Sequence, residues 1–304
     1  MCDRQNADRG NKQAHAPTLL SHVVREAAGL RFNLYLIYKQ KVYEILEHLG
    51  EGALVLDLGS REGSFADGSY PVRAVRLDLG VPQRATRMFV QADAARLPFA
   101  ARTFHAVILN HSLEHIRELK PALQEIGRVV RKDGAVFVSV PDATTIADRV
   151  YRKFYRNRGG HVNLFDSAAK LERLLAWYLG LPHVATRTLY SSMNFLNRRN
   201  TREAVRLRQM LFAGLPEFIL APIGAAARWM DRWFGTRLSV YGWAFYFGRI
   251  EEAVDTTPLE NVCVRCGQAR PADELLRRGI PRHLLLKSYR CADCGARNIF
   301  TSPA

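Results

Sequence analysis

Cysteine and long apolar runs are both scarce in this sequence, and each scarcity argues against a class of protein. Four of the 5 cysteines stand in two Cys-x-x-Cys pairs. That spacing favours a metal site in a reducing compartment over a disulfide framework. No segment approaches the roughly 18 apolar residues that a membrane-spanning helix needs. The best candidate, residues 218–227, is short and contains Pro222. We therefore expect a cytoplasmic protein with no transmembrane segment.

Acidic residues are also few, with 29 Asp and Glu against 44 Lys and Arg, which gives a formal net charge of +15. The excess lies mainly in residues 143–250, which hold 17 basic and 6 acidic residues. A basic surface attracts phosphate groups, so this region favours peripheral contact with an anionic membrane or with RNA. A solvated, arginine-rich face without any partner is an equal alternative.

The apolar fraction of 48% and the 304-residue length predict one large domain and a small appendage. Residues 1–17 are almost devoid of apolar side chains, so they predict a disordered tail and lack the apolar core of a secretory signal. We place the main domain at 18–250, with a helical insertion at 191–238, and a metal-binding module at 251–304.

Short apolar segments alternate with amphipathic ones along the main domain. Strands are predicted at 53–57, 74–78, 88–91, 105–109, 135–140, 184–190 and 240–248. Helices are predicted at 18–49, at 121–131 (closed by Asp133-Gly134) and at 166–178 (with Asp166 as the N-cap). The segments after Gly63 and after Leu79 are too short for full crossover helices. Buried strands alternating with helices predict an α/β, Rossmann-like, doubly wound and mostly parallel seven-stranded sheet.

Chemistry-bearing residues follow the first two of these strands. The first ends in Asp57-Leu-Gly59-Ser60-Arg61-Glu-Gly63, a turn whose glycines let the backbone approach a ligand closely. The second ends in Asp78, placed so that its carboxylate can accept both hydroxyls of a ribose. A nicotinamide dinucleotide site would need a Gly-x-Gly-x-x-Gly turn, and Gly59-Ser60-Arg61 breaks that spacing.

Further landmarks complete a recognisable order: Gln91-Ala-Asp93-Ala94, Leu97-Pro-Phe99, Asn110-His111-Ser-Leu-Glu114-His115 and Glu125-Ile-Gly-Arg128. Residues 54–142 thereby resemble the class I S-adenosylmethionine-dependent methyltransferases of the type eleven group. In that family the residue at the place of Asp93 binds the adenine amino group. The resemblance and the turn together assign the cofactor to Asp57, Gly59, Ser60, Gly63, Asp78, Leu79, Asp93, Ala94 and Asn110. Arg61 departs from the family, which usually has a second glycine there.

Methyl transfer from a sulfonium needs alignment more than covalent help, although a hydroxyl acceptor also needs a base. His111 follows the fourth strand, where ligands bind, and His161 lies in a glycine-led loop. Both are catalytic candidates, and an ordinary hydrogen-bonded loop histidine is an equal reading of His161. For Glu114 and His115 a structural role is favoured, because they belong to the family signature.

The insertion at 191–238 is the expected reader of the acceptor. Its tryptophans, phenylalanines and arginines would suit an amphipathic helix lying in a membrane interface. We favour a helical lid with buried aromatic side chains, and the two roles can coexist.

The C-terminal module carries Cys263-x-x-Cys266-Gly and Cys291-x-x-Cys294-Gly, which resemble the knuckles of a zinc ribbon. Four thiolates close a tetrahedral site, so the expected Zn²⁺ is structural, with iron as a minor alternative. RNA contact, protein docking and bracing of the main domain all stay open as roles. Cys2 has no evident partner.

The sequence therefore predicts a methyltransferase for a small-molecule, lipid-linked or glycan acceptor. One alternative is an RNA or protein methyltransferase that uses the basic surface and the zinc module. Another is a non-catalytic, methyltransferase-like scaffold.

Overall fold

A computed structural model describes residues 43–60, 63–82, 86–155, 160–201, 214–250, 254–280 and 287–301. All of these residues fall within the unit 34–304. The predicted tail, most of the predicted helix over 18–49, Cys2 and Arg61 lie outside the described residues. Of that first helix, the structure describes α2 (Tyr43–His48).

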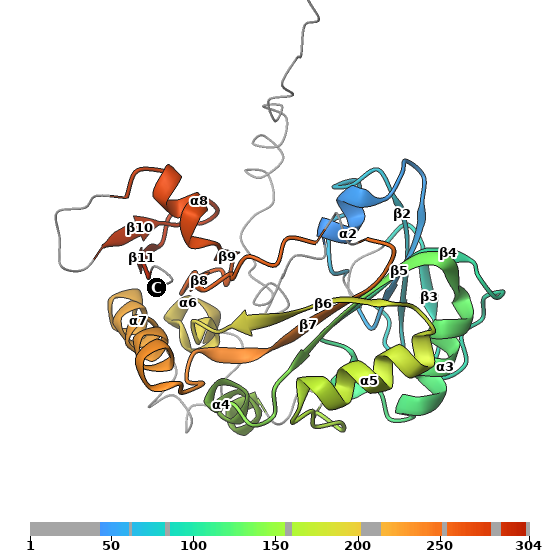
Figure 1. The fold of residues 1–304 in the computed structure, drawn as a ribbon, viewed down its shortest axis with the longest axis horizontal. Coiled ribbons are helices and arrows are strands. Elements are labelled where there is room, and N and C mark those ends of the chain that lie inside the picture. Colours follow the sequence, from blue (N-terminus) through green and yellow to red (C-terminus); the bar gives the residue numbers. More distant parts are fainter. Residues whose placement is uncertain are drawn as a thin grey trace, which may run out of the picture. The chain divides into compact units, whose positions relative to one another are not determined.

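The main domain is built on a seven-stranded sheet with the order β3-β2-β1-β4-β5-β7-β6 (Figure 1). The strands are β1 (Leu54–Leu58), β2 (Arg73–Asp78), β3 (Phe89–Gln91), β4 (Phe104–Asn110), β5 (Val130–Pro141), β6 (His183–Tyr190) and β7 (Val240–Gly248). Pairing is parallel from β3 through β5, and β7 runs antiparallel to both β5 and β6. The predicted Rossmann-like, mostly parallel fold is confirmed.

Helices cover both faces of this sheet. On one face, α3 (Leu119–Val129) and α5 (Ala168–Leu179) pack their apolar sides onto the strands and onto each other. On the other face, Ile45 and Leu46 of α2 join a second core cluster with Phe137 and Tyr246. Burial on both faces explains why the central strands read as continuous apolar runs.

Three local predictions need correction. The N-cap of α5 is Ser167, whose hydroxyl accepts a hydrogen bond from the Lys170 N–H, and not Asp166. Helix α3 ends at Val129, and Asp133-Gly134 lies inside the early part of β5 rather than closing the helix. Helix α4 (Ile146–Tyr155) was not predicted. The segments 63–72 and 79–82 contain no helix, as expected of trimmed crossovers.

The described part of the insertion holds a 3₁₀ turn, η3 (Asn194–Leu196), and two helices, α6 (Arg198–Thr201) and α7 (Glu217–Phe234). The expectation of a lid with buried aromatic side chains is wrong for α7. Its Phe218, Trp229, Trp233 and Phe234 are exposed, and its buried side is formed by small and aliphatic residues together with Arg228. Residues 202–213 lie outside the described part of the chain.

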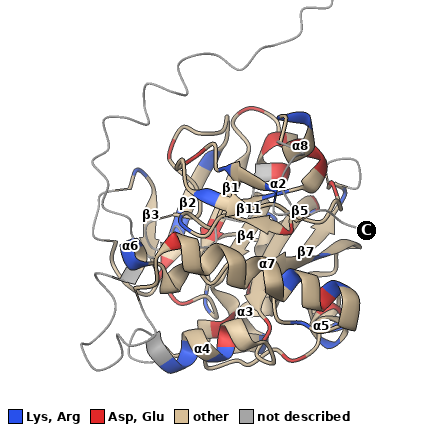
Figure 2. Cartoon of the chain, turned by 90° about the vertical axis from the view of Figure 1, so that its left-hand side faces the viewer, with Lys and Arg blue, Asp and Glu red and all other residues tan. Residues whose placement is uncertain are grey.

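The Lys and Arg residues of the described chain are spread over several elements in the view of Figure 2. Arg187 and Arg228 are buried, and Arg187 pairs with Glu44 of α2 at 3.0 Å. Arg198, Arg199 and Arg232 are exposed. Several of these arginines therefore stabilise the fold, and only part of the excess is available to a partner.

The described residues of the C-terminal segment form two small hairpins and one helix. These are β8 (Asn261–Val262) with β9 (Ala269–Arg270), α8 (Ala272–Arg277), and β10 (Ser288–Arg290) with β11 (Arg297–Ile299). Among the described residues, no helix has both the length and the apolar character to cross a membrane.

Candidate active site and cysteine cluster

The strand order reverses between β1 and β4, because the chain leaves β1 toward β2 and β3 and returns to the other side of β1 at β4. We call the edge of the sheet beyond this reversal the crevice. In open α/β sheets, ligands bind beyond the carboxyl ends of the strands at such a reversal. Gly59 and Ser60 follow β1 here, and His111 follows Asn110, the last residue of β4. The fold thus brings the two sets of predicted residues to the same crevice.

Asp57 shapes the turn after β1 from inside. Its carboxylate is fully buried and accepts hydrogen bonds from the Ser64 N–H and the Ser64 hydroxyl, both at 2.7 Å. The Ser60 hydroxyl donates to the Asp57 carbonyl at 3.0 Å. Burial raises the pKa of Asp57, and the Ser64 hydrogen bonds and the Arg76 charge oppose that rise. Asp57 therefore holds the turn in shape rather than facing a ligand.

Gly59 and Gly63 both adopt left-handed backbone conformations, with φ of +69° and +99°. A Cβ on Gly59 would collide with the side chain of Ser112, and one on Gly63 would collide with the buried guanidinium of Arg76. Arg76 also donates to the Phe65 carbonyl at 2.6 Å and pairs with Asp67. Only glycine fits at either position of the turn.

Asp78 and Leu79 end β2 beside this turn. The Asp78 carboxylate accepts from the Gly80 N–H at 2.8 Å and is partly exposed, while Leu79 is 69% exposed. An exposed apolar side chain next to a partly free carboxylate is what a nucleoside needs for its ring face and its sugar hydroxyls.

Asp93 and Ala94 follow β3 in the same row. Asp93 accepts from the Ala95 N–H at 3.0 Å and pairs with Arg96 at 2.6 Å, and Ala94 is buried. The segment beneath them is held from α3, because Glu125 accepts from the Leu97 N–H and Arg128 donates to the Phe99 carbonyl. The hydrogen bond with Arg128 lowers the pKa of Glu125, and burial opposes this effect.

Asn110 and His111 occupy the end of β4. The Ser139 hydroxyl donates to the Asn110 side-chain oxygen at 2.8 Å, and the His111 N–H donates to the Ser139 carbonyl. His111 has φ of +52°, an uncommon conformation for a non-glycine residue. Its ring lies against Tyr241 of β7, with 5.4 Å between the centroids.

The second catalytic candidate, His161, lies with Glu114 and His115 of η2 (Leu113–His115). Its Nδ1 is 3.4 Å from Asp148, and its ring contacts that of His115. Burial lowers the pKa of His161 to about 4. A group with that pKa is a weak base at neutral pH, so His161 is a poor candidate for the general base.

Glu114 is the buried centre of this group. Burial would raise its pKa, but the His111 hydrogen bond and the charges of three nearby histidines outweigh burial and lower it. His111 Nδ1 lies 3.6 Å from a Glu114 oxygen. The structure therefore brings both catalytic candidates, His111 and His161, onto one carboxylate, which the sequence did not indicate.

The four predicted cysteine ligands also come together. The Sγ atoms of Cys263 and Cys294 are 3.5 Å apart, those of Cys266 and Cys291 are 3.6 Å apart, and all four lie within 4.8 Å of one another. Gly267 and Gly295 both have left-handed backbone, and each donates its N–H to the carbonyl of the first cysteine of its pair. The two knuckles therefore have the same turn conformation.

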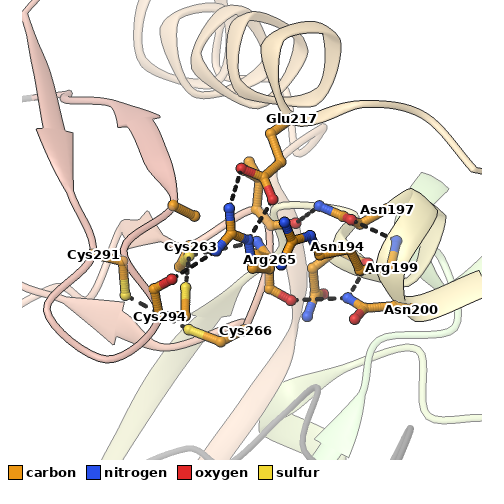
Figure 3. Close-up of polar contacts among 12 residues, drawn as sticks. Asn194, Asn197, Arg199, Asn200, Glu217, Cys263, Arg265, Cys266, Cys291 and Cys294 are labelled. Carbon is orange, nitrogen blue, oxygen red and sulfur yellow. Dashed lines mark hydrogen bonds and ion pairs between the residues drawn. The ribbon is translucent and has the colours of Figure 1, made fainter. Parts of the chain in front are cut away.

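The first knuckle is bound to the insertion (Figure 3). Asn197 donates to the Val264 carbonyl at 2.9 Å, and Asn200 donates to the Arg265 carbonyl at 2.8 Å. Arg265 forms a two-pronged ion pair with Glu217 at the start of α7 and donates to the Cys294 carbonyl at 2.6 Å. The cysteine cluster and the start of α7 are thus joined through one arginine.

The comparisons with known proteins bear on the family of the chain. A family model described as a methyltransferase domain matches residues 31–181, which include the turn after β1, Asp78, Asp93 and the end of β4. The chain belongs to the class I S-adenosylmethionine-dependent methyltransferases.

Similarity to individual proteins is partial. The methyltransferase is 33% identical over 97 residues to a demethylmenaquinone methyltransferase of Renibacterium salmoninarum, which is 29% of this chain and 41% of that protein. A demethylmenaquinone methyltransferase of Paenarthrobacter aurescens matches at 31% identity over 38% of its length. The chain thus covers less than half of either relative. A methyltransferase structure from Archaeoglobus fulgidus shares 15% identity, covering 72% of this chain and 96% of that one, with a TM-score of 0.49.

Several supporting residues of the methyltransferase escaped prediction from the sequence. Ser64, Arg76 and Asp148 act through contacts between distant elements, which no local pattern reveals. The Glu125 and Arg128 pair has a usable signal, since opposite charges three residues apart on a helix face each other.

Proposed function

We propose that this methyltransferase transfers the methyl group of S-adenosylmethionine to a small-molecule, lipid-linked or glycan acceptor. The observation that carries the proposal is the row of residues beyond β1, β2, β3 and β4, all at one edge of the sheet. Two relatives are named for methylating demethylmenaquinone, which supports a small molecule rather than RNA or protein as acceptor.

The residues of the crevice suit the cofactor. The Asp78 carboxylate would accept the ribose hydroxyls, Asp93 and Ala94 would border the adenine, and Gly59 and Ser60 would offer backbone at the methionine end. Bound S-adenosylmethionine supplies a methyl group on a positively charged sulfur. The protein's part is to align the acceptor with that group and to exclude water. His111, at the end of β4 and facing Glu114, is the better placed of the two candidate bases.

Helix α7 supports the lipid-linked acceptor. Trp229, Trp233 and Phe234 are 55%, 67% and 66% exposed, and Arg232 is exposed beside them. Arg237, three residues beyond the helix, is also exposed and pairs with Asp142. Aromatic rings with adjacent cations suit the boundary between lipid headgroups and acyl chains of an anionic membrane. A cavity of about 980 Å³ lies between α7, the β6–β7 edge and the C-terminal module, with Trp229 and Arg237 in its wall. An acceptor with an apolar tail and an anionic group would match that lining.

The four cysteines would bind a structural Zn²⁺. Zinc–sulfur bonds of about 2.3 Å in a tetrahedron place sulfurs about 3.8 Å apart, close to the 3.5 and 3.6 Å between these Sγ atoms. Four thiolates leave no position for substrate, so the contacts to α7 and to Asn197 support bracing as the role of the module. Reduced thiols also favour the cytoplasm as the location.

Calorimetric titration with S-adenosylmethionine tests the first part of the proposal. We expect the wild-type chain to bind with micromolar affinity and Asp78→Ala to bind at least tenfold more weakly, about 1.4 kcal/mol. Asp133→Ala, an exposed carboxylate in the bulged part of β5, is the matched control and should bind as wild type does. Equal affinity of all three would refute the role of Asp78. A wild type that fails to bind would favour the non-catalytic scaffold.

Sedimentation with vesicles tests the second part. The full chain should sediment with anionic vesicles and not with zwitterionic ones, and Trp233→Ser with Phe234→Ser should reduce binding roughly tenfold or more. Trp177→Ser on α5, which removes an 82% exposed tryptophan elsewhere, is the control. Equal losses from both surfaces, or salt-sensitive RNA binding without vesicle binding, would overturn the membrane contact.

A further inference from the structure

A second group of metal-ligating side chains lies beside the cofactor crevice. Glu114, His115 and His161 each offer one ligand atom, and these atoms all lie within 4.8 Å of one another. Glu114 and His115 belong to η2, directly after β4, whereas His161 comes from the loop before α5. Two imidazole nitrogens and one carboxylate oxygen form a donor set that suits divalent transition metals such as Zn²⁺ or Mn²⁺.

The carboxylate of this group is buried and incompletely bonded. The Glu114 side chain is 2% exposed, and its Oε2 atom has no hydrogen-bond partner among the described residues. A buried carboxylate oxygen without a donor is costly unless a cation satisfies it. The exposed His115 leaves the group open on one side, so an ion could enter and keep free positions.

The backbone around the carboxylate is fixed. The N–H groups of Val162 and Asn163 donate to the Glu114 carbonyl at 2.8 and 3.1 Å. The Asn163 side chain donates to the carbonyls of Leu113 and Ile116. These bonds attach the His161 loop to η2, so the three side chains are held together by contacts that do not involve their own ligand atoms.

His161 also has the outer partner that metal-binding histidines commonly have. Its Nδ1 lies 3.4 Å from Oδ1 of the fully buried Asp148, and Asp148 is held by Arg152. This carboxylate lies on the Nδ1 side of the ring, so Nε2 is the nitrogen left for a metal ion. The contact with a buried carboxylate distinguishes His161 from a histidine that only fills a surface loop.

The group adjoins the expected methyl donor. Ser112, two residues before Glu114, touches the cofactor turn so closely that Gly59 has no room for a Cβ. The group and the cofactor turn therefore adjoin each other at the segment that follows β4.

We propose that Glu114, His115 and His161 bind one divalent transition-metal ion, which receives a hydroxyl of the acceptor; this role rests on the proposed function. The bound cation lowers the pKa of the hydroxyl, whose proton passes to solvent. The acceptor oxygen then attacks the methyl carbon, forming a carbon–oxygen bond as the carbon–sulfur bond breaks. The electron pair of the broken carbon–sulfur bond stays on sulfur. The products are neutral S-adenosylhomocysteine and a methyl ether.

Cobalt(II) is the probe, added to the full chain already loaded with one zinc per molecule. We expect one further equivalent to bind, with weak visible absorption and without thiolate-to-cobalt charge-transfer bands. His115→Ala, at an exposed position that is safe for folding, should weaken this binding at least tenfold, as should Glu114→Gln. His183→Ala removes another histidine that faces a glutamate, Glu172 at 3.5 Å, and should bind cobalt as wild type does.

The result is independent of methyl transfer, since the titration contains neither cofactor nor acceptor. Calorimetry with S-adenosylmethionine on the same variants shows that they are folded and reports on the cofactor site separately. No further equivalent in the wild type, equal uptake by His115→Ala and wild type, or uptake only with thiolate bands would each overturn the proposal. In that case the histidines and Glu114 form a hydrogen-bonded network.

Discussion

Gly59 and Gly68 show how one backbone conformation serves two purposes. Their φ angles are +69° and +76°, so a side chain at either position meets the same local strain. Their surroundings differ, because a Cβ on Gly59 would overlap Ser112, whereas one on Gly68 has nothing within 4 Å. Gly68 is needed only for the turn, and Gly59 is also needed for the contact between the ends of β1 and β4.

Alanine at these two positions separates the effects. We expect Gly68→Ala to lower the free energy of unfolding by about 1 kcal/mol, the cost of left-handed backbone. Gly59→Ala should lower it by roughly 2–4 kcal/mol, since overpacking adds to that cost, and should also weaken S-adenosylmethionine binding. Urea unfolding followed by circular dichroism measures both. Equal losses would mean that the Ser112 contact has no energetic weight.

At the residue scale, the sequence was informative wherever chemistry follows the end of a strand. Asp57, Gly59, Asp78, Asp93 and Asn110 all lie at the edge where they were expected. The actual role of Asp57 could not be read, because it depends on Ser64 folding back over the carboxylate. The sequence favoured a structural role for Glu114. It did not indicate that the Glu114 side chain is buried against histidines from two segments.

Among the elements, α5 illustrates the limit of a one-dimensional signal. Asp166 and Ser167 are both good N-cap residues, and the sequence does not choose between neighbours of that kind. The structure selects Ser167, whose backbone is extended at φ −149° and ψ 120° and whose hydroxyl faces the Lys170 N–H. Helix α4 was missed although the sequence carries its signal, because Ala147, Val150 and Tyr151 recur at helical spacing.

The capping assignment predicts unequal effects of two adjacent substitutions. Ser167→Ala should lower the free energy of unfolding by about 1 kcal/mol, because one N–H at the start of α5 loses its acceptor. Asp166→Ala should cost no more than about 0.5 kcal/mol, since its ion pair with Lys170 is exposed on both sides. Thermal or urea unfolding of both variants provides the measurement, and the reverse order would restore Asp166 as the cap.

For the whole molecule, the C-terminal module and the insertion share a core. Val264, between two cysteines, packs with Phe195, Leu196 and Leu220, and Arg228 of α7 donates to Thr301. The sequence indicated a separate module at 251–304 because its cysteine spacing is self-contained. Packing between segments far apart in the chain, which the spacing cannot encode, makes the fold of one depend on the other.

This shared core predicts that loss of zinc spreads beyond the cysteines. Cys291→Ala should increase amide exchange at least tenfold, about 1.4 kcal/mol, in η3, α6 and α7, because the carbonyls of Val264 and Arg265 no longer hold Asn197 and Asn200. The amides of β1 and β4 should keep their protection, since their partners lie within the sheet. Hydrogen exchange read by mass spectrometry resolves these segments, with Cys2→Ser as the thiol control. Unchanged exchange in α7 would mean that the insertion folds without the module. The zinc module would then not brace the insertion.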